Sequence, residues 1–264
     1  MQGWINGEIE HANLQQLLEQ HGSPDVIYHL AGGSSVGLSI EQPLEDFYRT
    51  VDATARLLEW MRHACPQTRL VYISSAAVYG DGHEHPISES APLRPYSPYG
   101  YHKLMAEELC ESYVKWYGLP VTVVRFFSLF GPGLSKQLVW DVCVRLKKGL
   151  PLRLGGSGDE RRDWLYIDDA VRLLIHLWCS TGACHAIYNG GTGKAMRVAD
   201  VVKTIVRLWG AHVDVCFSGI SRPGDPPYLV ADVSRIREVG FRPEVGLEEG
   251  LARTVSWFRE QHED

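Results

Sequence analysis

The sequence predicts an α/β protein with a mostly parallel sheet covered by helices. Apolar runs rich in β-branched and aromatic residues alternate with helical stretches along the first half of the chain. These runs are apolar on both faces, which is typical of strands buried between two layers of helices. With 264 residues, 45% of them hydrophobic, the chain is long enough to bury one large domain, or one domain and a small lobe.

The elements of the first half follow one another in a regular order. A short helix is expected at residues 13–20, because its leucines share one face and a glycine and a proline follow its end. A strand at residues 26–30 and a long helix at residues 43–64 come next. The apolar run at residues 70–74 predicts a second strand, and a loop with four prolines separates it from a helix at residues 99–117.

A strand at residues 121–127 completes this alternation, and beyond Gly133 the pattern loosens. Helices and short strands still alternate there, without an internal repeat or a linker, so we expect a smaller lobe. Helices are expected at residues 135–148, 168–179, 198–209 and 247–259, and short strands at residues 152–154, 187–188 and 213–217.

Charge and composition exclude several classes of function. The formal net charge is −6 and there is no basic run, so nucleic acid is not an expected partner. No apolar stretch approaches the roughly 20 residues of a membrane span, and the first residues lack the pattern of a signal peptide, which predicts a cytoplasmic protein. The six cysteines lack Cys-x2-Cys spacing, so buried thiols are expected and neither disulfides nor a metal site.

Tyr99 and Lys103 are the first candidates for chemistry. They lie four residues apart at the start of an expected helix, where one face carries both side chains and an ammonium can favour the ionised phenol. Ser75 ends the expected strand upstream, at the sheet edge where α/β proteins present reactive groups. The alternative is a surface lysine beside a core tyrosine. Together with Ser75, the pair predicts a tyrosine acid/base whose proton is shared with a serine hydroxyl.

At this point the chain resembles the extended short-chain dehydrogenase/reductases, in particular the NAD-dependent epimerase/dehydratase branch that acts on nucleotide sugars. The resemblance runs from about Gly3 to Phe258, and six matches in order are far more specific than any one of them. The matching segments are residues 29–36 (HLAGGSSV), 73–80 (ISSAAVYG), 97–103 (SPYGYHK), 125–133 (RFFSLFGPG), 161–169 (RRDWLYIDD) and 222–225 (RPGD).

The resemblance implies a Rossmann-type doubly wound sheet whose N-terminal part is missing. Residues 1–130 would form a partial NAD-binding domain, and residues 131–264 mainly a substrate lobe interleaved with the sheet. NAD is the implied cofactor, with NADP left open. The implied cofactor-binding residues are His29, Leu30, Ala31, Ser74, Tyr99 and Lys103.

The family's Gly-x-x-Gly-x-x-Gly turn, which holds the dinucleotide pyrophosphate, has no counterpart in the sequence. The strand at residues 26–30 would then have an unpaired edge. Three explanations remain open: a clipped or mis-started reading frame, a partner chain that supplies the strand, or a homologue that no longer holds NAD. The first is favoured.

The substrate implied by the resemblance is a nucleotide-diphosphate sugar. Arg162 and Arg222 stand where relatives contact the diphosphate, and planar guanidinium groups suit that task. Asp225 matches the acidic residue that binds a ribose hydroxyl. Ser128 replaces an asparagine common in relatives, which leaves the identity of the sugar open. Trp140 is expected to pack in the core rather than to stack on a base.

The resulting hypothesis is an NAD-dependent nucleotide-sugar epimerase, acting at C4 through a transient keto sugar, with Ser75, Tyr99 and Lys103 as its catalytic residues. A nucleotide-4-keto-sugar reductase and a truncated non-catalytic homologue remain alternatives. Dehydration is disfavoured, because Ala76 and Ala77 stand where 4,6-dehydratases carry an aspartate and a glutamate. By resemblance, we expect a homodimer formed through the two long helices.

Overall fold

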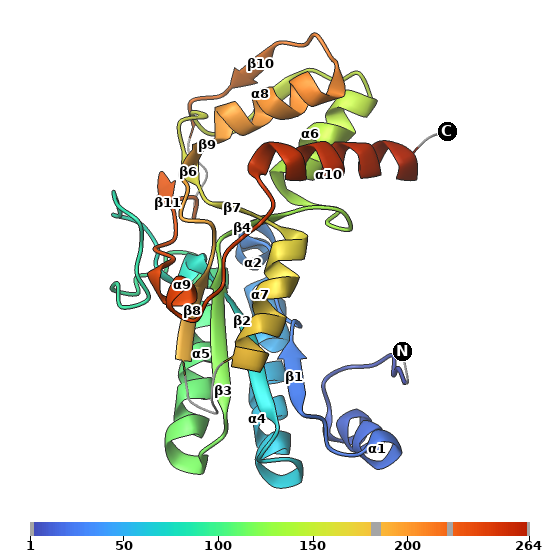
Figure 1. Ribbon diagram of the computed structural model, residues 1–264, viewed down its shortest axis with the longest axis vertical. Coiled ribbons are helices and arrows are strands. Elements are labelled where there is room, and N and C mark those ends of the chain that lie inside the picture. The colour runs from blue at the N-terminus through green and yellow to red at the C-terminus, as the bar shows by residue number, and fades with distance from the viewer. Residues whose placement is uncertain (1–2, 181–185, 221–223, 263–264) are drawn as a thin grey trace. The chain divides into compact units, whose positions relative to one another are not determined.

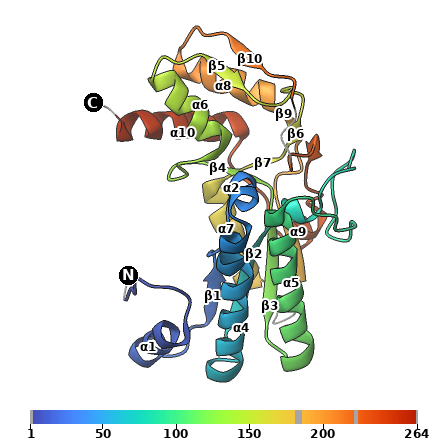
Figure 2. The ribbon, with the colours of Figure 1, turned by 180° about the vertical axis from the view of Figure 1, so that it is seen from behind.

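The computed structural model describes residues 3–180, 186–220 and 224–262 (Figures 1 and 2). Its contacts divide the chain into two compact units, each with its own hydrophobic core. Unit 1 contains the residues up to Gly80 together with Glu89–Phe126 and Leu174–Tyr188. Unit 2 contains Asp81–Ser88, Phe127–Leu173 and the residues from Asn189 onward.

A four-stranded sheet forms the centre of unit 1, in the order β1-β2-β3-β8. β1 pairs in parallel with β2, and β2 pairs in parallel with β3. All six residues of β3 are buried, as expected for a strand covered on both faces. The strands are β1 (Val26–His29), β2 (Arg69–Ser75), β3 (Val121–Phe126) and β8 (Ala186–Gly190).

Helices cover both faces of this sheet, which confirms the predicted Rossmann-type class. Leu58 of α4 and Cys110 of α5 belong to the same buried cluster as Leu70 and Tyr72 of β2. The end of α7 lies on the opposite face, as the two views show (Figures 1 and 2). The helices are α1 (His11–His21), α2 (Val36–Glu41), α3 (Pro43–Phe47), α4 (Ala53–Ala64), α5 (Pro98–Tyr117) and α7 (Ile167–Ser180).

The long helix predicted at residues 43–64 contains a π-helical segment, Tyr48–Asp52, between α3 and α4. Such segments are rare and are often found at functional sites. Here the segment carries Thr50, whose Oγ1 accepts a hydrogen bond of 2.8 Å from the backbone N–H of Gly33. The π-helical segment therefore anchors the glycine turn that follows β1.

Unit 2 consists of short strands and helices around a core rich in aromatic residues, among them Phe130, Trp164 and Phe258. Its described strands pair as β4 with β7, β5 with β10, and β6 with both β9 and β11. They are β4 (Ser128–Phe130), β5 (Leu152–Leu154), β6 (Arg161–Arg162), β7 (Trp164–Tyr166), β9 (Met196–Arg197), β10 (Val215–Phe217) and β11 (Tyr228–Leu229). The helices are α6 (Gln137–Lys147), the start of α7, α8 (Val198–Trp209), α9 (Ser234–Glu238) and α10 (Leu247–Gln261).

The long predicted elements are confirmed, whereas the sequence patterns missed the short ones. The missed elements span two to six residues, which is too short for a helical or alternating period to show. The strand predicted at residues 213–217 begins only at Val215, and the one predicted at residues 187–188 extends over Ala186–Gly190. The missed elements are α2, α9, β4, β6, β7, β9 and β11.

Across the part of the chain that the structure describes, no helix is both long and apolar enough to cross a membrane. Within the same residues, no group of three or more His, Cys, Asp or Glu side chains is arranged to hold a metal ion.

Cys65, Cys110 and Cys143 are buried as predicted, whereas Cys179 and Cys216 are exposed, which corrects the prediction for those two. Cys184 lies outside the described residues. The cytoplasmic location stays a prediction.

Candidate active site

In unit 1, the end of β2 meets the start of α5. Ser75 is the last residue of β2, and Tyr99 lies in the first turn of α5. The Ser75 side chain lies close enough to the Tyr99 phenol to lower its pKa. Gly100 allows this approach, because a Cβ atom on it would lie 2.7 Å from the backbone oxygen of Ala77. A larger residue at position 100 would push α5 away from the strand end.

Two serines fix the start of α5. Ser97 is the N-cap residue, and its Oγ accepts a hydrogen bond of 3.2 Å from the N–H of Gly100. The Oγ of Ser39 in α2 accepts a hydrogen bond of 3.0 Å from the N–H of Tyr99. Pro98 at the first helical position has no N–H to satisfy. The backbone that carries Tyr99 is thus held by capping bonds before any ligand binds.

Lys103 lies one turn further along α5 and is 4% exposed. Its Nζ donates a hydrogen bond of 2.9 Å to the backbone oxygen of Ile73 and lies 6.0 Å from the centre of the Tyr99 ring. Burial lowers the pKa of Lys103 to about 8, although the negative charges of Asp46 and Glu107 oppose this effect. The pKa of the Lys103 ammonium therefore lies only slightly above neutral pH.

The expected lowering of the Tyr99 pKa by Lys103 is not found. Burial raises the pKa of Tyr99 and the charge of Asp46 adds to this, while the Ser75 side chain acts in the opposite direction. The physical reason is geometric, since the Lys103 ammonium donates to the backbone of Ile73 rather than to the phenol. At physiological pH Tyr99 is therefore a neutral phenol.

The predicted cofactor residues of unit 1 differ in their surroundings. His29 is buried at the end of β1, with its Nε2 2.9 Å from the Oγ1 of Thr54, and burial together with the charge of Lys103 lowers its pKa to about 4. Leu30 and Ala31 are exposed on the following loop. Ser74 is buried, and its hydroxyl donates to Glu107. The side chain of Ser74 therefore binds a buried carboxylate within the protein.

In unit 2, the structure describes three of the four predicted substrate residues and brings two of them, Arg162 and Asp225, into contact. Arg162 in β6 is 7% exposed and forms an ion pair with Asp225. Ser128 is half-buried in β4, opposite Trp164 of β7. Arg222 lies outside the described residues. Within the described residues, Arg162 uses two of its N–H donors, toward Asp225 and the backbone oxygen of Arg161, so it retains donors for an anion.

Asp163, which the sequence reasoning did not single out, anchors the loops around Arg162. Its carboxylate is fully buried and accepts hydrogen bonds from the N–H and the hydroxyl of Thr192, from Gly193 N–H and from Ala231 N–H, at 2.7–3.2 Å. These four donors replace the water that a carboxylate loses on burial. Asp163 therefore fixes the backbone beside Arg162.

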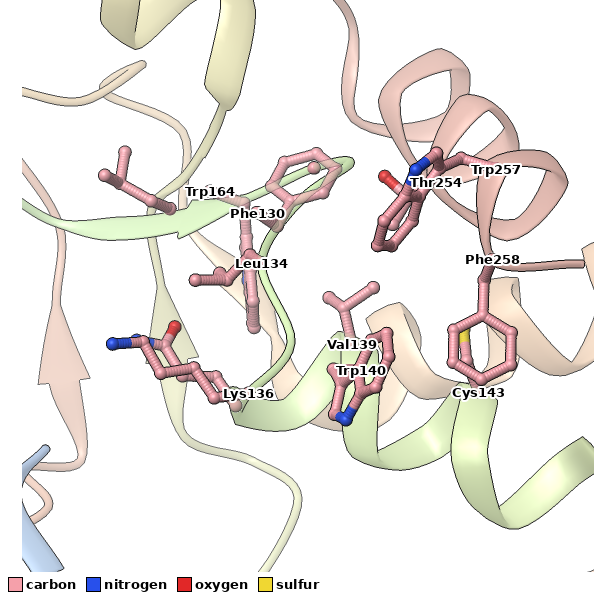
Figure 3. A pocket seen from close by; sticks show the side chains of 13 residues that line it. Phe130, Leu134, Lys136, Val139, Trp140, Cys143, Trp164, Thr254, Trp257 and Phe258 are labelled. Carbon is pink, nitrogen blue, oxygen red and sulfur yellow. The ribbon is translucent and has the colours of Figure 1, made fainter. Parts of the chain in front are cut away.

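A pocket in unit 2 lies between the β4 end and helices α6 and α10 (Figure 3). It is lined by Phe130, Leu134, Trp164 and Trp257 among others, so it is predominantly apolar. Trp140 packs edge-on against Phe258, with 4.9 Å between the ring centres. The structure thus agrees with core packing as the role of Trp140.

The structure also shows a buried charge network in unit 1 that the sequence reasoning did not assign. Arg125 of β3 is 2% exposed and donates to the carboxylate of Glu107 through Nε and Nη2, at 2.6–3.1 Å. Its Nη1 donates to the Tyr79 hydroxyl at 3.1 Å. An arginine in an otherwise apolar strand was a usable signal, because a buried guanidinium requires a counterion. Position 107, four residues after Lys103, supplies it.

The fold and the cluster of Ser75, Tyr99 and Lys103 define a Rossmann-type α/β protein with a tyrosine-based site. The family model described as the NAD dependent epimerase/dehydratase family matches residues 4–191. The chain belongs to this family, so it is an enzyme of a class whose cofactor is NAD.

Similar proteins include both epimerases and dehydratases. A UDP-glucose 4-epimerase of Azospirillum brasilense is 31% identical, over 97% of this chain and 79% of its own length. The solved structure of a Bacillus cereus UDP-glucuronic acid 4-epimerase, in complex with UDP-glucuronic acid and NAD, has a TM-score of 0.90 at 27% identity and covers 98% and 82% of the two chains. The dTDP-glucose 4,6-dehydratase DesIV of Streptomyces venezuelae, with NAD bound, has a TM-score of 0.87 at 31% identity, covering 96% and 78%.

The residues of unit 1 fit one end of NAD. Of the three N–H donors of buried Lys103, one is matched by a described residue, which leaves two for hydroxyl groups such as those of a ribose. A Cβ atom on Gly32, at φ +142°, would lie 3.2 Å from that ammonium, and the exposed Leu30 and Ala31 directly precede this glycine. The printed sequence contains no Gly-x-x-Gly-x-x-Gly turn for the pyrophosphate. The fit therefore concerns the nicotinamide-ribose end alone.

Proposed function

We propose that the protein is an NAD-dependent nucleotide-sugar epimerase that inverts C4 of the sugar through a transient keto sugar. The observation that carries this proposal is the cluster formed by Ser75 at the end of β2 with Tyr99 and Lys103, which lie one helical turn apart on α5. The names of the relatives support it, since UDP-sugar 4-epimerases are among the most similar sequences and structures. Residues 1–130 and 131–264 remain the proposed division into cofactor and substrate parts.

Tyr99 exchanges the proton of the sugar hydroxyl in this proposal. As a phenolate it accepts that proton when the carbon is oxidised, and it returns the proton when the carbon is reduced. The Ser75 hydroxyl donates to the phenolate and spreads its charge. Lys103 holds the ribose of the cofactor through its unused donors, and its positive charge favours the ionised phenol.

NAD, when bound, supplies the reversible two-electron oxidation of the sugar carbon and a positive charge that favours ionisation of the phenol. Because burial raises the pKa of Tyr99, this added positive charge is what favours the ionised phenol. Tyr99 thus gains its basic form with the ligands in place. His29, neutral at physiological pH, adds no competing positive charge.

The substrate side of the proposal rests on Arg162, Arg222, Asp225 and Ser128. Arg162 is largely shielded from water, so an ion pair with a diphosphate is stronger there than at the surface. Asp225, which already binds Arg162 and is about half exposed, accepts a ribose hydroxyl. Ser128 donates a hydrogen bond to a phosphate or carbonyl oxygen, with a shorter reach than an asparagine.

The direct test is conversion of a UDP-sugar or a dTDP-sugar to its C4 epimer without added reductant. We expect Tyr99→Phe to lower kcat at least about a hundredfold, because the proton acceptor is lost. Tyr101→Phe is the matched control, since Tyr101 is an exposed tyrosine on the same helix, and it should leave kcat unchanged. Equal activity of wild type and Tyr99→Phe would refute the mechanism.

The same assay separates the alternatives. A conversion that occurs only while NADPH is consumed identifies a nucleotide-4-keto-sugar reductase. Absence of bound NAD in mass spectrometry of the purified protein, together with no uptake of added NAD, identifies a non-catalytic homologue. A 4-keto-6-deoxy product would identify a dehydratase, which Ala76 and Ala77 disfavour, because the methyl groups beside Ser75 cannot transfer protons.

We further propose that the protein forms a homodimer through the two long helical stretches of unit 1. Large apolar side chains are exposed on both, among them Leu44 and Tyr48 on one and Tyr101 and Met105 on the other, at 42–63%. Sedimentation or light scattering measures the mass directly. A charge placed at this face, Met105→Glu, should shift a dimer to monomer.

A further inference from the structure

Asp46 is a buried carboxylate beside the proposed active site that the proposed mechanism does not use. It lies in α3 and is 6% exposed. The Nδ1 of His102 in α5 donates to its Oδ2 at 2.6 Å. Phe47 covers the His102 ring edge-on, with 5.7 Å between ring centres. A shielded carboxylate–imidazole pair therefore joins two helices next to Lys103.

The other carboxylate oxygen of Asp46 lies against the glycine turn that follows β1. A Cβ atom on Gly33 would lie 1.7 Å from Oδ1 of Asp46, so a side chain at this position would displace the carboxylate. A Cβ atom on Gly32 would lie 3.2 Å from the Nζ of Lys103. Two consecutive glycines thus touch the carboxylate and the ammonium, and the turn lies between α3 and the reactive face of α5.

We propose that Asp46 is a positioning residue, held by His102, which fixes the Gly32–Gly33 turn and maintains the positive charge of Lys103. The inference rests on the proposed function, because Lys103 matters only if the site binds a cofactor. It assigns a role to a pair that is 56 positions apart in the sequence. Asp46 acts through Lys103 and the turn, and it need not touch a substrate.

The electrostatic part of this inference follows from the groups that face Lys103. Asp46 of α3 and Glu107 of α5 stabilise its charged form, and burial opposes them. His29 of β1 is neutral at pH 7, and the rings of Tyr72 in β2 and Tyr99 in α5 lie 5.4 and 6.0 Å from Nζ. Glu107 is already shared with Arg125. Removing the charge of Asp46 should therefore change the pKa of Lys103 more than removing the charge of Glu107.

The test is an NMR titration of the Lys103 ammonium in the full chain, with the signal assigned by Lys103→Met. In Asp46→Asn, which keeps the shape of the side chain, we expect the pKa of Lys103 to fall by about one pH unit, roughly tenfold in proton affinity. Glu45→Gln is the matched control, because it removes one negative charge from the preceding, half-exposed position of α3. An unchanged Lys103 titration in Asp46→Asn would overturn the proposal.

Two further variants test the geometry. Gly33→Ala forces the carboxylate off the turn and should lower the pKa of Lys103 as Asp46→Asn does. His102→Ala removes the donor to Asp46, and His102→Asn, whose amide nitrogen mimics Nδ1, should restore the wild-type titration. If Asp46→Asn does not fold, the His102 pair decides the question. Equal titrations in His102→Ala and wild type would contradict the role of His102.

Activity supplies an independent readout. If wild type converts a nucleotide sugar, Asp46→Asn should lower kcat about tenfold, leave KM for the sugar within twofold, and shift the pH profile in step with the Lys103 titration. A fall in kcat without a shift of the profile would contradict the electrostatic role. If wild type converts no sugar, the proposed function fails, while the titrations still decide whether Asp46 sets the charge of Lys103.

Discussion

The two units use buried charge in different ways. In unit 1, buried charged side chains bind mainly one another and side-chain hydroxyls, as in the group of Glu107, Arg125 and Ser74. In unit 2, the buried carboxylates of Asp163 and Asp169 mainly accept hydrogen bonds from backbone N–H groups of distant loops.

This difference indicates what each kind of burial achieves. A carboxylate that binds backbone amides fixes the path of a loop, and neutral N–H donors stabilise its charge. A carboxylate that faces a cation sets the protonation of that cation, as Asp46 and Glu107 do for Lys103. In unit 1, buried carboxylates therefore influence the protonation of a buried cation, whereas in unit 2 they hold loops in place.

The largest effect is expected from breaking the Glu107–Arg125 pair. Glu107→Ala leaves the 2% exposed Arg125 without a counterion, and we expect a loss of about 3–5 kcal/mol in the free energy of unfolding. Denaturant titration measures this. Glu111→Ala, one turn further along α5 and half-exposed, is the control and should change stability little.

The double variant Glu107→Leu with Arg125→Met sharpens this prediction. A well-packed apolar pair avoids the cost of a lone buried charge, so the double variant should lose less stability than Glu107→Ala. A double variant as unstable as the single one would mean that Ser74 and Tyr79, which also bind the pair, carry most of its stability.

A slightly smaller effect is expected from pH, through His29. The pKa of buried His29 is about 4, against 6.5 for an unfolded histidine. Between these values the unfolded chain binds the proton and the folded chain does not, so stability falls as the pH falls from 6.5 to 4, by about 3 kcal/mol. His29→Gln should remove this part of the pH dependence in unfolding titrations. Parallel pH curves for both proteins would show that His29 is not the group.

The sequence alone predicted the sheet and the long helices of unit 1. Residues 70–74 and 121–127 are apolar on both faces, and the helix at 99–117 has an N-cap serine and a proline at its start, so local signals agree with the fold. The strands of unit 2 have two or three residues, and their place depends on tertiary partners such as Ser128 and Trp164. No local period encodes such pairing.

For the cluster in unit 1, the sequence predicted that Ser75, Tyr99 and Lys103 lie close together, but not their electrostatics. The spacing of Tyr99 and Lys103, and the position of Ser75 at a strand end, were sufficient to place them together. The raised pKa of Tyr99 depends on burial and on Asp46, which is distant in sequence. The Asp46–His102 pair shows no local pattern at all, because it forms only when α3 and α5 pack.

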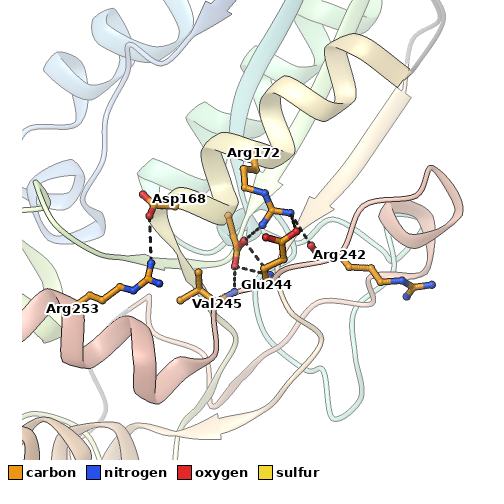
Figure 4. A network of polar contacts seen from close by, with 7 residues as sticks. Asp168, Arg172, Arg242, Glu244, Val245 and Arg253 are labelled. Atoms are coloured by element: carbon orange, nitrogen blue, oxygen red, sulfur yellow. Dashed lines mark hydrogen bonds and ion pairs between the residues drawn. The ribbon is translucent and has the colours of Figure 1, made fainter.

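A moderate effect is expected at the start of α7 in unit 2, where Asp169 ties the helix to the segment around Glu244 (Figure 4). Its fully buried carboxylate accepts from the N–H groups of Glu244 and Val245 at 2.9–3.1 Å and pairs with Arg172. Asp169→Asn should cost about 2 kcal/mol of unfolding free energy, because the amide cannot accept all of these bonds. Asp168→Asn, at the exposed neighbouring position, is the control. Equal losses in both would contradict the tether.

The smallest expected effect is a gain in stability, at the start of a helix that lacks a side-chain cap. α5 of unit 1 begins with Ser97, whose Oγ caps it, whereas α10 of unit 2 begins with Gly246 and has no side-chain cap. Gly246 has an extended backbone, open space around its Cα, and Glu249 three residues later, so Gly246→Ser creates a capping box. We expect about 0.5 kcal/mol of added stability in denaturant titration. Gly246→Ala lacks the hydroxyl and is the control, so a gain no greater than that of the alanine variant would show that the start of α10 needs no cap.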